Sequence, residues 1–441
     1  MKNKDTLISI GIIIFLSLIL GFLWFLIIIN TNNDNNNMVM NGNKSISYKS
    51  VKEVAKDEEI NGDSFKSTSA DENAILVLNK AKSNISDINI DKKGDSSSGD
   101  NTSFYGINSA LLVKDGAVVS IKDAIINTDA TGANGVFSYG GSATTKNSSG
   151  DGSTVNISDS KITTIKDNSG GIMITGGGVM NATNLDITTS GTSSAAIRSD
   201  RGGGKVTVNK GTYVTKGKGS PAAYSTADIT INNSTLVSEV SEGLIIEGKN
   251  KIAIDNVNLT DTNSVLHGQS TTYKNIFIYQ SMSGDADTGT ALFSAKKSTI
   301  VTNKGDSIYV TNTKANIILE NNKFINNDSD GNFIRIQNDS WGSAGSNGGK
   351  VNLELKNQSI TGNIVVDSIS ELSIDLKNSS YYEGILNNSD SAKSIVLSLD
   401  KSSKIKLNGD FYVSQLKDTD KEYSNIDLNG YKLYVNGKSI K

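Results

Sequence analysis

The sequence predicts an all-β fold, a single-stranded right-handed parallel β-helix, preceded by one amino-terminal transmembrane helix. Three observations lead to this prediction: an apolar pattern that repeats along most of the chain, a composition rich in turn-forming residues but nearly free of proline, and one long apolar run close to the amino terminus. With 441 residues, the chain is long enough for a repeat domain with a continuous core.

In the repeated pattern, an apolar residue is followed five positions later by a second one, with Asn, Asp, Lys, Ser or Gly between them. From Ile157 to Ile278, successive copies begin 25, 26, 23, 23 and 24 residues apart. Self-similarity at a period of about 20 to 50 residues is typical of repeat architectures. The pairs are Ile85/Ile90, Ile121/Ile126, Ile157/Ile162, Ala182/Ile187, Val208/Tyr213, Ile231/Leu236, Ile254/Leu259, Ala295/Ile300, Leu319/Phe324, Leu355/Ile360 and Leu376/Tyr381.

Each copy predicts a strand, a turn and a second strand. Alternation with a period of two places one set of side chains on the inside. A lone unit cannot bury that inner face, so we expect the chain to coil, with each strand pairing with its equivalent one coil later. Asn156, Asn232, Asn256 and Asn357 are predicted at left-handed turn positions, where their amides would stack into a ladder.

Proline usage agrees with stacked strands. A strand that pairs on both edges needs its backbone N–H groups, so proline is excluded from its interior. Pro221 is the only proline in the chain, whereas glycine occurs 42 times. Glycine, asparagine, serine and aspartate therefore supply the turns.

The amino-terminal segment predicts a membrane anchor. Residues 7–29 are almost entirely apolar, and a helix of that length spans a bilayer core of about 30 Å. Lys2 and Lys4 precede the run and no positive charge follows closely, so a cytoplasmic segment 1–6 and a translocated remainder are expected. A cleaved signal peptide is the alternative. Residues 30–44 are expected to form a disordered Asn-rich linker. The predicted protein is thus single-pass in the cell membrane, with the plasma membrane as a partner and its bulk extracellular.

Residues 45–441 are predicted to form the extracellular β-helix. We interpret residues 45–70 as the cap of the first coil. Segments 140–153 and 337–349 interrupt the repeat and are expected as loops on the side of the rod, where binding usually occurs. From about residue 424, two Asn-Gly signals beside alternating apolar residues predict a hairpin cap that shields the last rung.

The repeat template, as in residues 229–236 (ITINNSTL), resembles that of right-handed parallel β-helix proteins of the pectate-lyase-like group. An anchor followed by such a body is similar to the adhesin-like surface β-helix proteins of low-GC Gram-positive bacteria. The resemblance covers about residues 70 to 441. It implies the fold, but β-helices serve as lyases, hydrolases, adhesins and spacers alike, so it implies no single activity.

Composition excludes several functions. The net charge is −3 and arginine occurs only at Arg198, Arg201 and Arg335, so no basic field favours nucleic acid as a partner. The absence of cysteine excludes disulfides, thiolate metal sites and a cysteine nucleophile. The single histidine, His267, cannot complete a catalytic triad or a histidine-rich metal site.

No sequence motif supplies a complete set of catalytic residues. Resemblance to polygalacturonases would require several acidic and histidine elements, of which only Asn127-Thr128-Asp129 is present. For the alternative function, a polysaccharide lyase or glycoside hydrolase acting on acidic polysaccharide, the candidates lie in residues 198–205: Arg198, Asp200, Arg201 and Lys205. Arginine forks bind acidic sugars well. A solvated salt-bridge cluster on a turn is the other interpretation.

One acidic turn has the spacing of a calcium loop. Asn326, Asp328 and Asp330 occupy alternate positions and supply oxygen ligands that suit Ca²⁺, the one cofactor considered. Position twelve of that spacing is Gln337, and a strand is expected to follow. Turn formation alone also explains these residues.

Aromatic side chains often carry carbohydrate binding. Trp341 lies in the glycine- and serine-rich segment 337–349, where burial is hard to arrange, and Asp339 and Arg335 are close in sequence. These three residues are the candidate ligand-binding set. Their alternative role is to hold the loop on the rod.

Together these observations predict a cell-surface anchored, adhesin-like β-helix protein with a binding or structural role, its candidate ligand a cell-wall or host polysaccharide. The alternative is the lyase or hydrolase described above.

Overall fold

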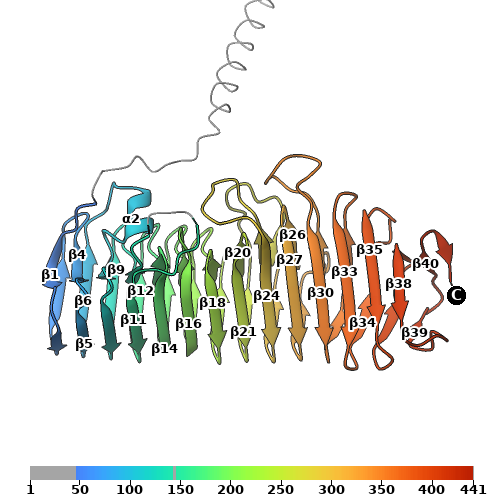
Figure 1. Cartoon of the computed structure of the whole chain (residues 1–441), viewed down its shortest axis with the longest axis horizontal. Coiled ribbons are helices and arrows are strands. Elements are labelled where there is room, and N and C mark those ends of the chain that lie inside the picture. Colours follow the sequence, from blue (N-terminus) through green and yellow to red (C-terminus); the bar gives the residue numbers. More distant parts are fainter. Residues whose placement is uncertain (1–45, 143–145, 441) are drawn as a thin grey trace, which may run out of the picture. The chain divides into compact units, whose positions relative to one another are not determined.

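The computed structural model describes residues 46–142 and 146–440. The chain divides into two units, Met1–Ile46 and Ser47–Lys441, and the second unit is nearly all parallel β-sheet. Its strands follow one another in sequence order along the solenoid (Figure 1). The prediction of a parallel β-helix is confirmed at this level, because each strand pairs in parallel with the equivalent strand of the next coil.

Most coils contribute one strand to a 12-stranded sheet and one or two strands to a 22-stranded sheet, called here the first and second sheets. The first sheet contains β1 (Ser50–Val54), β4 (Asn73–Val77), β7 (Leu111–Val113), β10 (Val136–Tyr139), β13 (Ile172–Thr175), β15 (Ile197–Ser199), β17 (Ala223–Ser225), β20 (Leu244–Glu247), β23 (Lys274–Tyr279), β26 (Asp306–Thr311), β29 (Ile334–Ile336) and β32 (Ile364–Val366).

The second sheet contains β2 (Glu58–Asn61), β3 (Ser64–Ser67), β5 (Lys82–Ser86), β6 (Asn89–Lys93), β8 (Val118–Lys122), β9 (Ile125–Asp129), β11 (Thr154–Ser158), β12 (Lys161–Thr164), β14 (Gly178–Thr189), β16 (Gly204–Thr215), β18 (Asp228–Asn232), β19 (Thr235–Ser238), β21 (Lys251–Asp255), β22 (Asn258–Asp261), β24 (Thr290–Lys296), β25 (Thr299–Thr302), β27 (Lys314–Glu320), β28 (Lys323–Asn326), β30 (Lys350–Lys356), β33 (Glu371–Lys377), β35 (Ser394–Leu399) and β38 (Gln415–Asp418).

A left-handed residue between the two second-sheet strands of a coil explains the five-residue spacing. It lies two positions after the first apolar residue of each pair, as at Asp159 (φ 50°), Asn233 (φ 53°) and Asn256 (φ 55°). The amides do stack: Asn256 Nδ2 donates to Asn233 Oδ1 at 2.9 Å, and Asn233 Nδ2 to Asn209 Oδ1 at 2.9 Å. The predicted left-handed turn position was wrong for Asn156 and Asn232, which lie in strands β11 and β18, although Asn156 Oδ1 accepts a hydrogen bond from Asn181 Nδ2 at 2.9 Å.

Inward side chains form ladders through the centre. Ile157 pairs in register with Ala182, and Ala182 with Val208, all at most 2% exposed. One predicted copy is wrong. Ile254 stacks on Ala295, whereas Ile278 belongs to the first sheet. First-sheet strands also carry inward apolar residues, and Ile278 happens to lie at the spacing expected for the next second-sheet copy.

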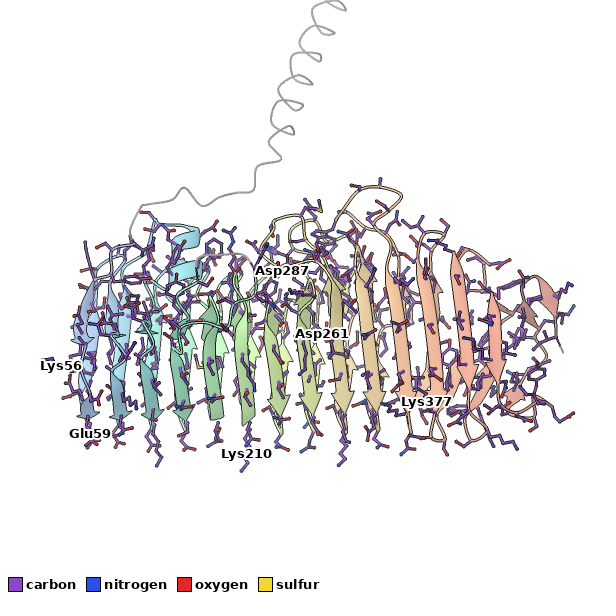
Figure 2. All side chains as sticks on the ribbon, viewed as in Figure 1. Lys56, Glu59, Lys210, Asp261, Asp287 and Lys377 are labelled. Carbon is purple, nitrogen blue, oxygen red and sulfur yellow. The ribbon has the colours of Figure 1, made fainter. Side chains whose placement is uncertain are left out.

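Long loops enter or leave first-sheet strands. The described parts of segment 140–153, which are residues 140–142 and 146–153, are loops that follow β10, and segment 337–349 is a loop that follows β29, as expected. Three further insertions were not predicted: 94–110, which contains the short helix α2 (Asp100–Tyr105), 262–273 and 280–289. Figure 1 shows α2 and the long loops at one edge of the solenoid, and in Figure 2 Asp287 lies at this edge while Lys210 points away at the opposite edge. The loops therefore border the outer face of the first sheet.

The carboxy-terminal coils narrow into two small sheets. One contains β31 (Ser359–Thr361), β34 (Tyr381–Gly384), β36 (Lys404–Leu407) and β39 (Ile426–Asp427), and the other β37 (Phe411–Val413), β40 (Leu433–Val435) and β41 (Lys438–Ser439). Asn436 and Gly437, both with positive φ, join β40 and β41 in an antiparallel hairpin. Asn429 and Gly430 instead form a coil turn, because β39 and β40 continue the parallel pairing.

The predicted fold class needs one correction. It included a membrane-spanning helix at residues 7–29, but within residues 46–142 and 146–440 no helix is long and apolar enough to cross a membrane. The segments 1–6, 7–29 and 30–44 lie outside the described residues. The fold class supported here is the all-β parallel solenoid alone. Its right-handed sense stays a prediction, as does the extracellular location.

Candidate functional site

A groove of about 450 Å³ lies on the outer face of the first sheet. Its floor is formed by strands β15 to β23, and its walls by α2, by segment 262–273 and by the loops 280–289 and 337–349. Some of the loops precede a first-sheet strand and others follow one, so they lie on opposite sides of the groove. Both long walls of the groove are therefore insertions into the repeat.

One outward-facing column of side chains runs along this floor. Its members are in register on successive coils, one per strand, and they are apolar or aromatic with arginine at two positions. In order they are Leu112, Phe137, Met173, Arg198, Tyr224, Ile245, Phe277, Tyr309 and Arg335.

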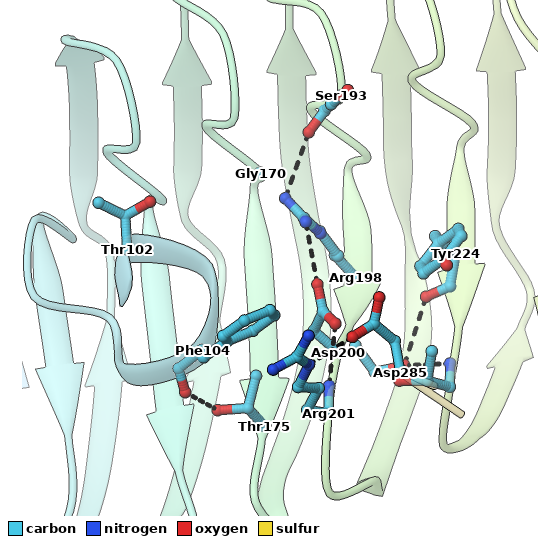
Figure 3. Close-up of polar contacts among 12 residues, drawn as sticks. Thr102, Phe104, Gly170, Thr175, Ser193, Arg198, Asp200, Arg201, Tyr224 and Asp285 are labelled. Carbon is cyan, nitrogen blue, oxygen red and sulfur yellow. Dashed lines mark hydrogen bonds and ion pairs between the residues drawn. The ribbon is translucent and has the colours of Figure 1, made fainter. Parts of the chain in front are cut away.

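The column is covered by α2 at one end, and its middle members lie at the groove. Leu112, Phe137 and Met173 are fully buried. Above them lies α2, whose Phe104 carbonyl accepts a hydrogen bond of 2.7 Å from Thr175 Oγ1 (Figure 3). The next four members, Arg198, Tyr224, Ile245 and Phe277, line the groove, and Tyr224 is half-buried. The groove therefore begins where α2 ends.

Arg198 and Asp200 form a sheltered ion pair at this point. Arg198 Nη2 lies 3.0 Å from Asp200 Oδ2, and Nη1 donates to the Ser193 carbonyl at 3.2 Å. The two side chains are only 13% and 9% exposed. Burial raises the pKa of Asp200; Arg198 opposes this shift and Asp285 adds to it.

Arg201 is paired with Asp285, which is 84 residues away in the chain. The guanidinium lies 3.9 Å from the centre of the Phe104 ring, so it is held between α2 and loop 280–289. Figure 3 shows both arginines with Asp200 and Asp285; the first three residues belong to one coil, and Asp285 reaches them from the loop after β23. Lys205, the fourth member of the predicted cluster, is exposed in β16 of the second sheet, away from the groove.

Trp341 closes the far end of the groove. Its ring packs at 5.2 Å from both Phe277 and Tyr279, measured between ring centroids. The loop is fixed by Asn347, whose Nδ2 donates to the carbonyls of Asp339 and Trp341 at 2.7 and 2.9 Å. Trp341 is half-buried and held rigidly, with part of its surface facing the groove.

Asp339 and Arg335 support this arrangement from below. Asp339 Oδ2 accepts a hydrogen bond from the Tyr309 hydroxyl at 2.8 Å, and its Oδ1 accepts one from Thr271. Arg335 Nε lies 2.5 Å from the buried Asp306. Neither residue lines the groove.

Buried charges lie beneath the aromatic rings. Lys274 Nζ is 3.6 Å from Glu242 Oε1, with the two side chains 0% and 6% exposed. The ammonium donates to the Thr272 carbonyl at 2.8 Å and lies 4.3 Å from the Phe277 ring centre. Burial lowers the pKa of Lys274, and Glu242 opposes this shift.

Glu247 joins two coils through tyrosine hydroxyls. It accepts hydrogen bonds from Tyr224, from Tyr279 at 3.2 Å and from Ser281. The residue is 1% exposed, and burial raises its pKa. Both tyrosines line the groove, so this carboxylate fixes two rings of its floor.

The acidic turn of Asn326, Asp328 and Asp330 lies outside the groove. Asp328 accepts backbone N–H bonds from Gly305 at 2.8 Å and Asp330 at 3.0 Å, which hold its pKa below the usual range. Asn326 turns its amide nitrogen toward the Gly305 carbonyl at 3.0 Å. Across the described ranges, no group of three or more acidic or histidine side chains is placed to hold a metal. Calcium binding stays a prediction.

The structure thus brings Arg198, Asp200, Arg201 and Trp341 around one groove, together with His267, which is exposed on segment 262–273. Sequence reasoning missed several residues of the same site: Tyr224, Glu242, Glu247, Lys274 and Phe277. A signal was present, because strands such as residues 243–246 are apolar on both faces.

The fold and the groove define a parallel β-solenoid with a loop-walled surface groove. Comparison with protein families, with curated proteins and with solved structures finds no significant match for this chain.

Proposed function

We propose that this protein binds a polysaccharide chain along the groove, in the manner of an adhesin-like β-helix protein. The observation that carries the proposal is the column Arg198, Tyr224, Ile245 and Phe277, which repeats one side chain per coil on the groove floor. Neighbouring strands are about 4.8 Å apart, similar to the length of one sugar in an extended glycan. A glycan parallel to the solenoid axis would meet one floor residue per sugar.

We expect most of the binding energy at the end of the groove where Trp341 packs on Phe277 and Tyr279. Trp341 presents a ring that Phe277 and Tyr279 hold in place, so little side-chain entropy is lost when a sugar packs on it. Polar groups on the walls, such as Asn168, Ser193 and Gln269, provide hydrogen bonds for hydroxyl groups. Apolar faces with a few polar groups are usual in ligand sites.

Titration of the purified protein with polysaccharide fragments tests the proposal. We expect Trp341→Ala to weaken binding by about tenfold or more, because a buried tryptophan often dominates an interface. The matched control is Tyr434→Ala, since Tyr434 is also half-buried and stacks on an aromatic neighbour, Tyr412, but lies in the last coils. Equal losses for both variants, or no binding to any fragment, would contradict the proposal.

A second candidate function is glycoside hydrolysis, which the raised pKa of Asp200 favours. A raised pKa suits a carboxyl group to act as a general acid, and Asp200 lines the groove close to Asp285. The assay is release of reducing sugar from polysaccharides by the intact protein and by Asp200→Asn. Activity in the first and its loss in the second would favour the enzyme.

A further inference from the structure

The cations at the groove are already neutralised by carboxylates of the same chain. Each arginine of the protein has an aspartate partner: Arg198 with Asp200, Arg201 with Asp285, and Arg335 with Asp306. The arginine side chains are 13%, 16% and 25% exposed, so these pairs are largely shielded from solvent.

The charge of Lys274, near the Trp341 end of the groove, is also neutralised within the chain. Lys274 is fully buried between Glu242 and the Phe277 ring, and it donates to Ser270 and to the Thr272 carbonyl. Its ammonium therefore has no surface to offer a ligand. Removing one partner of a buried pair leaves an uncompensated charge, so a ligand carboxylate cannot exchange with Glu242 or Asp200 cheaply.

The balance of charge on the walls is negative. Asp200, Glu242 and Asp285 are each balanced by one cation of the chain, whereas Asp100, exposed at the start of α2, adds a further negative charge. A uronic-acid or sulfated polymer would thus meet paired arginines and the negative charge of Asp100, and like charges at short range repel.

We infer that the groove takes an uncharged polysaccharide and rejects uronic-acid polymers. This inference rests on the proposed function, because it assigns the ligand class of the same groove. It also reverses the expectation that Arg198 and Arg201 would hold an acidic sugar through their guanidinium forks, since both forks face aspartates of the chain.

The test compares neutral with acidic hexasaccharides, using cello-, manno- and xylohexaose against hexagalacturonate, by calorimetric titration at pH 8, where an ordinary histidine is neutral. We expect at least one neutral probe to bind at least tenfold more tightly than hexagalacturonate, with an affinity that hardly changes with salt. Equal or tighter binding of hexagalacturonate overturns the inference but leaves the groove as a glycan site. If no probe binds, the proposed function itself fails.

A variant pair adds a second measurement. Asp285→Asn releases Arg201, so the ratio of hexagalacturonate to neutral affinity should rise about tenfold. Asp287→Asn is the matched control: it lies in the same loop, its side chain is equally exposed, and its partner Lys249 does not line the groove. An unchanged ratio in Asp285→Asn, or the same change in both variants, overturns the inference.

Discussion

The outer faces of the two sheets differ although both cover the same core. On the second sheet, outward charges pair in the open, as in Glu371 with Lys350 and Lys393, both at 2.8 Å. On the first sheet, Lys274 and Glu242 are buried beneath aromatic rings. The difference arises from the loops, which are inserted at first-sheet strands and exclude water there. The same strand geometry thus produces a plain solvated surface and a groove.

The largest contrast should appear when one cation is removed from each face. Lys274→Met leaves Glu242 buried and unpaired, so we expect a loss of about 3–5 kcal/mol in the free energy of unfolding. Lys350→Met removes an exposed partner of Glu371 and should cost less than about 1 kcal/mol. Chemical denaturation measures both.

Adding Glu242→Gln to Lys274→Met should restore part of the loss, because the uncompensated charge is then gone. Similar losses from Lys274→Met and Lys350→Met would show that the two faces do not differ energetically.

A second contrast concerns pH. Burial raises the pKa of Asp261 from its ordinary 3.8 to about 8. The folded state therefore retains a proton that the unfolded state releases, and stability is fully present below about pH 4 and is lost as pH rises toward 8. The loss should approach about 1.4 kcal/mol per pH unit at most.

Asp261→Asn should remove this slope, whereas Asp186→Asn, at an exposed position of the second sheet, should keep it. Thermal unfolding followed between pH 4 and 8 gives the comparison. A wild-type protein with constant stability over that range would contradict the burial of an ionisable Asp261.

The smallest effect is expected at the asparagine ladder of the second sheet. Lys297 adopts a left-handed conformation (φ 48°) between Asn256 and Asn321 of the adjacent coils. Asparagine tolerates this conformation better and would extend the ladder, so Lys297→Asn should stabilise the protein by about 0.5–1 kcal/mol.

Lys296→Asn is the control. Lys296 is the residue next to Lys297, but it lies in strand β24 and its side chain pairs with Glu320. It should bring no gain. A loss of stability in Lys297→Asn would show that the ladder contributes nothing at this turn.

These contrasts also show what the sequence could predict. The inward ladders, the coil turns and two of the loops follow from local patterns, because apolar spacing and turn residues act over a few positions. The groove does not. Arg201 meets Asp285 across 84 residues, and the insertion before Asp285 was hidden because Ile278, in the first sheet, fell at the expected spacing.

The outward column was hidden for a related reason. A strand that is apolar on both faces, such as residues 243–246, is predicted to be buried on both sides. The pattern does not distinguish the face that packs in the core from the face that lies under a loop. Trp341 was identified from its loop, but its contacts with Phe277 and Tyr279 depend on how the loop folds back over the sheet.

The most direct test of the groove is a crystal structure of the protein soaked with a neutral hexasaccharide. The sugar chain should lie along the solenoid axis over Arg198, Tyr224 and Phe277, with one ring against Trp341. Sugar density on the second sheet, or across the strands rather than along the axis, would contradict the account.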